Sequence, residues 1–141
     1  MATRTVAAVA TVVVQAVAAL VAAGVPRPTV DLNSPALVAN ILEQIELDEE
    51  TTSDLRAALD RKDEDATGEI LRGNGIAFSD AAKALCALIE TVGPADEVIS
   101  ELQALSLPAG AQAEVERLAA VVAGLHASMP DLPLTLDPVE Y

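Results

Sequence analysis

The sequence is poor in aromatic, cysteine and basic residues, and each shortage excludes a class of function. Its 141 residues include one Tyr, one Phe and no Trp, so no set of aromatic rings is present on which nucleobases could stack. The single cysteine, Cys86, excludes an intrachain disulfide and suits a reducing cytoplasm. Eight basic residues against 22 acidic ones give a net charge of −14, which repels nucleic-acid phosphates and anionic lipid surfaces. We therefore expect a cytoplasmic protein that binds neither nucleic acid nor membrane.

Apolar and acidic residues are abundant instead. Apolar residues make up 52% of the chain and the mean hydropathy is +0.39, which excludes disorder and provides a core for one domain. The acidic residues concentrate between Ser34 and Glu69, where eleven face three basic residues. Such a charge run is typical of short helices with solvated outer faces.

The first 24 residues are apolar and nearly uncharged, which leaves two interpretations open. Thr5–Gly24 has about the length of a membrane span, and Ala16-Val17-Ala18 resembles a signal-peptidase site. Against this, an apolar stripe recurs at helical spacing and there is no aromatic belt. We expect a helix over Thr5–Ala23 that packs in a soluble protein, with its stripe formed by Val6, Val9, Val13, Val17 and Leu20.

The remainder of the sequence alternates helices with turns, and a short strand stands at each end. Period-two alternation predicts strands at Thr29–Asn33 and Leu132–Asp137. Because two strands alone are marginal in water, we expect them to need partner strands from outside this chain. Between them, apolar spacing and capping residues predict only helices. The expected N-caps are Ser34, for a helix that reaches about Leu47, then Asp48 or Thr52, Asp63 and Ser79.

Two sequence patterns resemble ligand-binding loops without completing them. Asp63–Ile70 matches several positions of a calcium loop, but Asn74 stands where a bidentate Glu is required, so a surface charge run is favoured. Gly73-x-Gly75 follows a helix, and Phe78 replaces a third glycine, so a turn is favoured over a phosphate loop.

Isolated titratable residues give no catalytic group. His126 is the only histidine and lies at a helix end, where a structural or capping role is expected. Cys86 lies next to the apolar stripe of its helix, so we expect a buried, inert thiol. Among the carboxylates, only Asp31 and Asp137 on the predicted strands are candidates for acid catalysis. We expect no catalytic, cofactor-binding or metal-binding residue and no cofactor.

Three blocks of sequence carry a family resemblance, which is weakest over residues 1–21. They are Gly24–Val38 (GVPRPTVDLNSPALV), Leu55–Asp63 (LRAALDRKD) and Pro130–Tyr141 (PDLPLTLDPVEY). They resemble the regulatory subunit of ATP phosphoribosyltransferase, a paralogue of histidyl-tRNA synthetase, chiefly in its alphaproteobacterial form. The resemblance implies an α+β fold, predominantly helical, in which a class II synthetase-like antiparallel sheet carries a helical insertion. Residues 1–33 would supply a helix and strand of that core, residues 34–128 the insertion, and residues 129–141 a second core strand.

The resemblance also implies a function. Such subunits do not aminoacylate; they associate with a short catalytic subunit, support its activity and relay inhibition by histidine in the first step of histidine biosynthesis. The family's Arg-Gly histidine-binding motif would follow Tyr141, and its arginine-bearing ATP-site motif would precede Met1. The resemblance thus implies a middle part of the subunit that carries none of these ligand-binding residues. We expect a non-enzymatic protein with the catalytic subunit as partner, and self-association through strand edges.

The alternative is a free-standing acidic helical module that binds another protein. It rests on the acidic block alone and requires a partner with a basic groove.

Overall fold

The computed structural model describes residues 2–140, with side chains from residue 5 onward. Within these residues the chain forms seven helices and three short strands, so the fold is α+β and predominantly helical, as expected. In chain order the elements are α1 (Ala2–Ala22), β1 (Val30–Asn33), α2 (Pro35–Leu42), α3 (Glu49–Asp60), α4 (Glu64–Gly73), α5 (Asp80–Glu90), β2 (Gly93–Pro94), α6 (Ala95–Ala104), α7 (Ala109–Ser128) and β3 (Leu134–Asp137).

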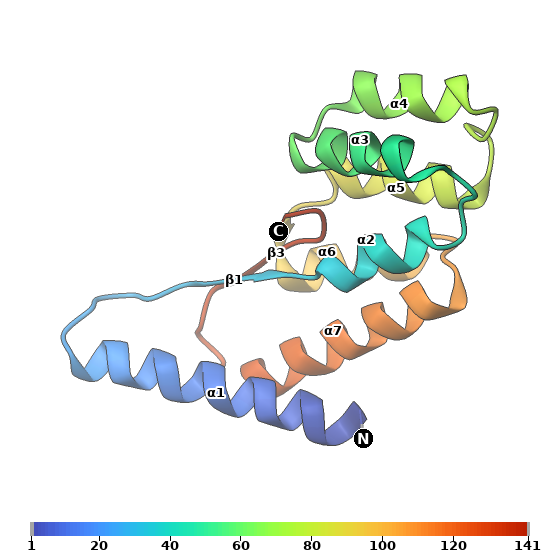
Figure 1. Ribbon diagram of the computed structural model, residues 1–141. Coiled ribbons are helices and arrows are strands. Elements are labelled where there is room, and N and C mark those ends of the chain that lie inside the picture. The colour runs from blue at the N-terminus through green and yellow to red at the C-terminus, as the bar shows by residue number, and fades with distance from the viewer. Residues whose placement is uncertain (1, 141) are drawn as a thin grey trace.

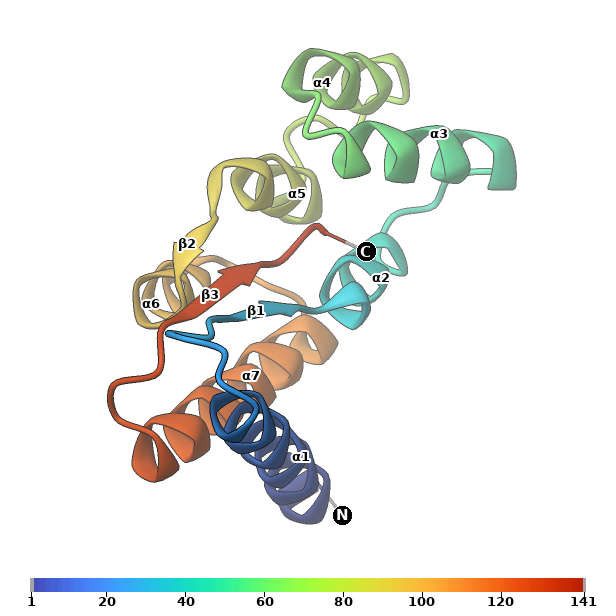
Figure 2. The same ribbon diagram turned by 90° about the vertical axis from the view of Figure 1, so that its left-hand side faces the viewer.

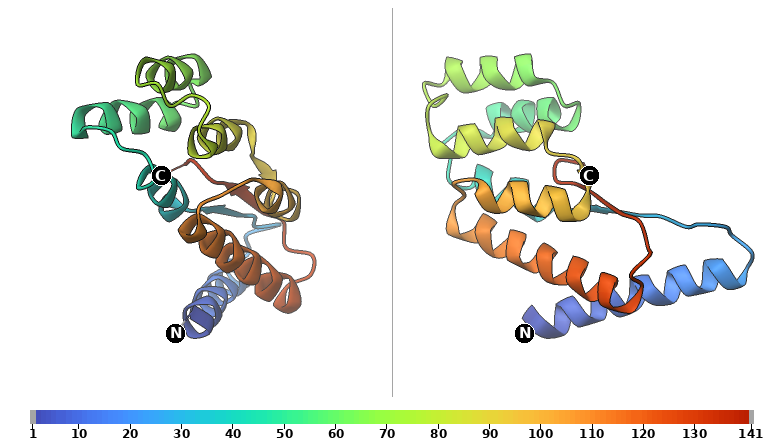
Figure 3. Two further views of the ribbon diagram at one scale, coloured as in Figure 1. Left: turned by 90° about the vertical axis from the view of Figure 1, so that its right-hand side faces the viewer. Right: turned by 180° about the vertical axis from the view of Figure 1, so that it is seen from behind.

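The helices stack in tiers above and below the small sheet, which lies at the level of α2 and α6 (Figure 1). The acidic helices α3 and α4 lie at one end with α5, while α2, α6 and α7 form the middle, and α1 packs along α7 at the other end. Figure 3 shows the same order from two further directions. The core runs through all tiers and includes the fully buried side chains of Leu37, Ile41, Leu55, Leu59, Leu71, Leu85, Leu88, Leu102, Leu125 and Leu136.

The three strands form one sheet in the order β1-β3-β2 (Figure 2). β1 and β3 pair in parallel with Val30 opposite Leu134 and Asn33 opposite Asp137. The expectation that partner strands come only from outside the chain is wrong, because the sheet gains a third strand, β2, from within it. β3 also pairs with β2 in antiparallel orientation, so the sheet is mixed, and a strand interrupts the stretch that was expected to be wholly helical.

Side-chain caps begin three of the helices where the sequence places them. Asp48 accepts a hydrogen bond from the Thr51 backbone N–H, and Asp63 accepts one from the Ala66 N–H. Ser79 does the same for Ala82, so these predictions are confirmed.

The predicted start of α2 is confirmed in position, and the predicted end is wrong. Ser34 occupies the N-cap position, but its side chain makes no capping hydrogen bond, because the hydroxyl is engaged elsewhere. The helix ends at Leu42, and turns replace the expected helix up to Leu47.

The helix α1 confirms the expected element but only part of its packing. Val17 is buried, and the earlier members of the apolar stripe are half-buried against the core. Leu20, at the end of the stripe, is 46% exposed, because the C-terminal half of α1 runs past the end of α7 (Figure 1). By length and composition alone Thr5–Ala22 could cross a membrane, a criterion that core helices and signal sequences also meet.

Candidate functional site

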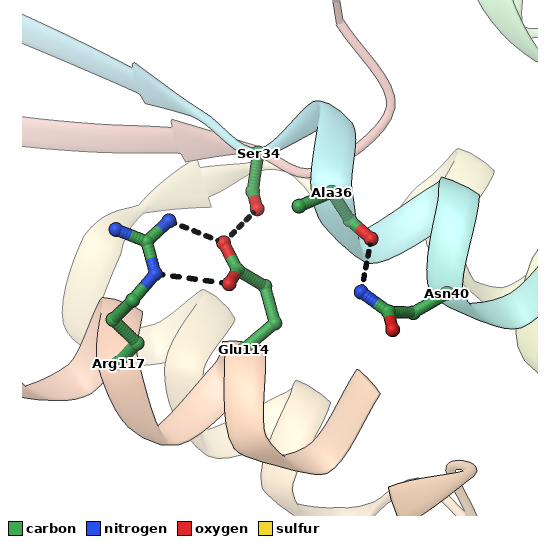
Figure 4. A network of polar contacts seen from close by, with 5 residues as sticks. All are labelled: Ser34, Ala36, Asn40, Glu114 and Arg117. Atoms are coloured by element: carbon green, nitrogen blue, oxygen red, sulfur yellow. Dashed lines mark hydrogen bonds and ion pairs between the residues drawn. The ribbon is translucent and has the colours of Figure 1, made fainter. Parts of the chain in front are cut away.

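A buried polar network joins the sheet to the helices (Figure 4). Ser34 stands between β1 and α2, and its hydroxyl donates to Glu114 Oε1 on α7 at 2.6 Å. Arg117, one turn further along α7, donates from Nε to Glu114 Oε2 at 2.9 Å and from Nη2 to Oε1 at 2.5 Å. Ser34 is 2% and Glu114 8% exposed, so the carboxylate is shielded from water and held on both of its oxygens.

Glu114 is ionised in this setting. Hydrogen bonds from Arg117 hold the pKa of the Glu114 carboxyl below its ordinary value, against the opposing effect of burial, and the Ser34 hydroxyl adds to the lowering. The same contact raises the pKa of the Arg117 guanidinium. The network is thus a charge-assisted clamp between the end of β1 and α7.

The clamp is not among the features predicted from the sequence, although the sequence carries a signal for it. Glu114 falls at a core-facing position of α7, between Ala111 and Leu118, and an Arg follows at i+3. A carboxylate on the buried face of a helix requires a partner, and an i,i+3 arginine supplies one. No sequence signal, however, identifies Ser34, eighty residues away.

Close approach of two helices completes the region beside the clamp. Gly110 in the first turn of α7 faces Asn40 of α2, and a Cβ at Gly110 would come within 2.4 Å of Asn40 Oδ1. The Asn40 side-chain amide donates to the Ala36 carbonyl at 2.8 Å (Figure 4). Gly110 therefore allows α7 to begin against α2.

The two strand carboxylates considered for acid catalysis are both engaged in hydrogen bonds. Asp31 accepts from the Thr135 hydroxyl on the neighbouring strand. Asp137 forms an ion pair with Lys62, in the turn between α3 and α4, and accepts from the Val139 N–H at 3.2 Å. These contacts give both residues structural roles in joining strands to each other and to the helices.

The lone cysteine and histidine lie apart from these residues. Cys86 is exposed, so the prediction of a buried thiol is wrong: the buried positions of α5 lie to either side of it, at Leu85 and Leu88. Partial desolvation and the nearby Glu64 raise the pKa of the thiol. His126, in the last turn of α7, has Nδ1 3.5 Å from Asp96 Oδ2 at the start of α6, which agrees with a structural role.

The two loop-like patterns are parts of a helix and a turn. Most of the calcium-like run lies within α4, with Asp63 as its N-cap. Among the described residues there is no group of three metal-ligating side chains. Gly75, at φ +72°, lies in the turn after α4 together with Asn74, which confirms the predicted turn there, whereas Gly73 is the last residue of the helix.

An apolar cleft of about 420 Å³ lies beneath the overhanging half of α1. Its walls come from the C-terminal half of α1 and from the segments that lead into β1 and β3. Arg27 and Asp131 are its charged residues; the other lining residues are Val17, Val21, Pro28, Met129, Pro130, Leu132 and Pro133.

Comparison with known proteins identifies the family. The model of the histidyl-tRNA synthetase family matches residues 1–141, and the chain belongs to this family. No solved structure gives a significant match.

The named relatives share a description that is more specific than the family. The chain is similar to the "ATP phosphoribosyltransferase regulatory subunit" of Paramagnetospirillum magneticum, with 43% identity over 93% of this chain, and to that of Rhodospirillum rubrum, with 38% identity over 95%. The subunit of Rhodospirillum centenum is 38% identical over 93%. These matches confirm the resemblance found in the three sequence blocks. The chain spans about a third of the length of these relatives.

Proposed function

We propose that this chain serves as part of an ATP phosphoribosyltransferase regulatory subunit. In this role it is not catalytic; it contributes to a cytoplasmic complex that supports the catalytic subunit and relays histidine feedback in histidine biosynthesis. The observation that carries the proposal is the similarity to regulatory subunits of three organisms, which extends over nearly the whole chain.

The arrangement of the polar residues supports a structural contribution. Ser34, Glu114 and Arg117 satisfy one another's hydrogen bonds, and Asp137 is paired with Lys62. Groups paired in this way hold elements in place, and their hydrogen-bonding atoms are already occupied by these contacts. We further propose that residues 34–128 act as a helical insertion in the synthetase-like core formed by residues 1–33 and 129–141.

A domain-replacement experiment tests the proposal. The matched region of the Rhodospirillum rubrum subunit is replaced by this chain, and the hybrid is mixed with the catalytic subunit of the same organism. We expect the hybrid to bind that subunit and to restore histidine-sensitive ATP phosphoribosyltransferase activity. A folded hybrid that neither binds nor confers sensitivity to histidine would refute the proposed function.

One observation favours the alternative of an acidic protein-interaction module. The eleven acidic residues between Ser34 and Glu69 fall largely on α3, α4 and their flanking turns, which form the tier farthest from α1 (Figure 1). If this tier binds a basic partner, the 141-residue chain alone should bind it with an affinity that falls steeply with salt. A salt-independent interaction would exclude this alternative.

A further inference from the structure

The cleft beneath α1 and its exposed rim form an apolar surface that the described residues leave uncovered. Leu20, Val21 and Val25 are 46%, 55% and 41% exposed. Val21 also lines the cleft, together with the buried Val17. We define this cleft and the three exposed side chains as the overhang surface.

The overhang surface continues the packing face of α1. Ala10 lies 3.5 Å from the position that a Cβ on Gly124 of α7 would take, so small residues bring α1 and α7 into close contact. Residues three or four apart share a helix face, which places Leu20 and Val21 in line with Val17. The same face is therefore covered as far as Val17 and open at Leu20 and Val21, in the last turn of the helix.

The outer edge of strand β1 is also without a partner strand among the described residues. β1 has β3 as its single partner within the described residues, so its outer edge presents unpaired backbone groups. The cleft is lined by Arg27 and Pro28, which lead into this strand, and both exposed apolar surface and open strand edges are features that soluble proteins normally cover.

The comparisons indicate what covers it. The match to the Rhodospirillum rubrum subunit extends over 134 residues of this chain, too many to leave out α1, yet it spans only 33% of that subunit. In the relatives, a similar helix is therefore accompanied by a large amount of additional polypeptide. A bilayer fits less well, because one side of α1 packs on α7 and the chain carries a charge of −14.

We propose that the overhang surface is the docking site for the part of the regulatory-subunit polypeptide that lies outside the matched region. An apolar element of that polypeptide fills the cleft against Val17 and Val21. The proposal rests on family membership and not on regulatory activity, so it can fail while the hybrid described above still responds to histidine.

Thiol labelling tests the proposal residue by residue. In a Cys86→Ser background, single cysteines are introduced by Leu20→Cys and Val21→Cys on the overhang surface. Gln15→Cys provides a matched control, because Gln15 is exposed and lies two residues before Val17, on the opposite side of the same helix. Labelling rates with a maleimide are compared between the isolated 141-residue chain and the hybrid subunit.

We expect labelling at Leu20→Cys and Val21→Cys to slow at least tenfold in the folded hybrid, whereas Gln15→Cys keeps its rate. Equal rates in the two proteins would overturn the proposal. Protection of the isolated chain that grows with its concentration would also overturn it, since a second copy would then be the occupant. Protection of all three positions by anionic or zwitterionic vesicles would instead assign the surface to a bilayer and overturn it.

A second arrangement keeps the test decisive if the hybrid is insoluble. The 141-residue chain is then co-expressed with the Rhodospirillum rubrum polypeptide that lacks its matched region. Slower labelling at Val21→Cys with an unchanged Gln15→Cys rate supports docking, and unchanged labelling at both positions overturns it.

Discussion

Replacing Ser34 by alanine should measure what the buried clamp contributes to stability. The Ser34 hydroxyl donates to the ionised Glu114 on α7 at 2.6 Å and makes no capping hydrogen bond to α2. Ser34→Ala therefore removes the contact with Glu114 and leaves the capping of α2 unchanged. Hydrogen bonds to charged groups contribute about 1.5–3 kcal/mol. We expect the lower end, about 1.5 kcal/mol, because Glu114 keeps both hydrogen bonds from Arg117.

Removing the carboxylate itself should cost more. Glu114→Ala leaves the buried Ser34 hydroxyl and the Arg117 guanidinium without their partner. Breaking a fully buried ion pair costs about 3–5 kcal/mol. We expect about 2–3 kcal/mol here, because the Arg117 side chain is 35% exposed and water can solvate it.

The clamp also predicts a direction of pH dependence. The pKa of Glu114 is lowered in the folded protein from its ordinary value of 4.5. Its ionised form therefore contributes stability that is fully present above about pH 4.5, and this contribution is lost as the pH falls through the folded-state pKa. The difference in stability between the native sequence and Ser34→Ala should accordingly be largest near pH 7 and shrink toward pH 3.

Urea unfolding followed by circular dichroism at pH 7 and at pH 3 measures these differences. Ser79→Ala is the matched control: the Ser79 side chain accepts from the Ala82 N–H at 3.1 Å, and its loss should cost about 1 kcal/mol at both pH values. A destabilisation by Ser34→Ala that grows as the pH falls, or that is absent at pH 7, would refute the role assigned to the clamp.

Three further predictions concern single side chains. The Thr67 hydroxyl is buried without a hydrogen-bond partner, so Thr67→Val should raise the free energy of unfolding by about 1 kcal/mol. A lower free energy of unfolding for this variant, measured in urea, would show that the hydroxyl has a hydrogen-bond partner. The exposed Cys86 thiol should react completely with a disulfide reagent in the folded protein. The reaction rate should increase as the pH rises through the raised pKa of the thiol. A thiol that reacts only after unfolding would contradict the exposure. Phe78 is 90% exposed, so Phe78→Ala should change the free energy of unfolding by less than about 0.5 kcal/mol. Leu37 is fully buried, so Leu37→Ala should lower the free energy of unfolding by about 2–5 kcal/mol. Similar losses of stability for both variants would contradict the burial assigned to these residues.

Local signals in the sequence predict the helices well. Asp48, Asp63 and Ser79 are short polar residues before apolar, helix-periodic runs, and each caps the following helix. Capping depends on atoms within three residues, so the sequence contains the necessary information. Ser34 shows the limit, because the same residue type in the same position donates instead to Glu114 on a distant helix.

Contacts between distant segments could not be predicted in the same way. The alternation at Val30–Asn33 and Leu134–Asp137 indicates strands but not their partners. Parallel pairing of β1 with β3 depends on the path of all the helices between them. β2 has only two residues, Gly93 and Pro94, which in the sequence indicate a helix stop and carry no strand signal.

The exposure of Cys86 and Leu20 follows from the same dependence on long-range packing. Periodicity predicts which side of a helix is apolar, but it does not tell how much of that side a neighbour covers. Leu20 belongs to the stripe of α1 and is exposed only because α7 ends before it. Cys86 lies beside the buried Leu85 on a helix whose outer face remains open.

Two polar contacts between distant residues join the strands to the helices. Ser34 and Glu114 connect the end of β1 to α7, while Lys62 and Asp137 connect the α3–α4 turn to the end of β3. If the helices moved away from the sheet, the buried Ser34 hydroxyl would lose its acceptor and Asp137 would lose its ion pair with Lys62, while Glu114 would keep Arg117. The region that resembles an insertion in the sequence is therefore connected to the sheet by polar contacts at two separate points.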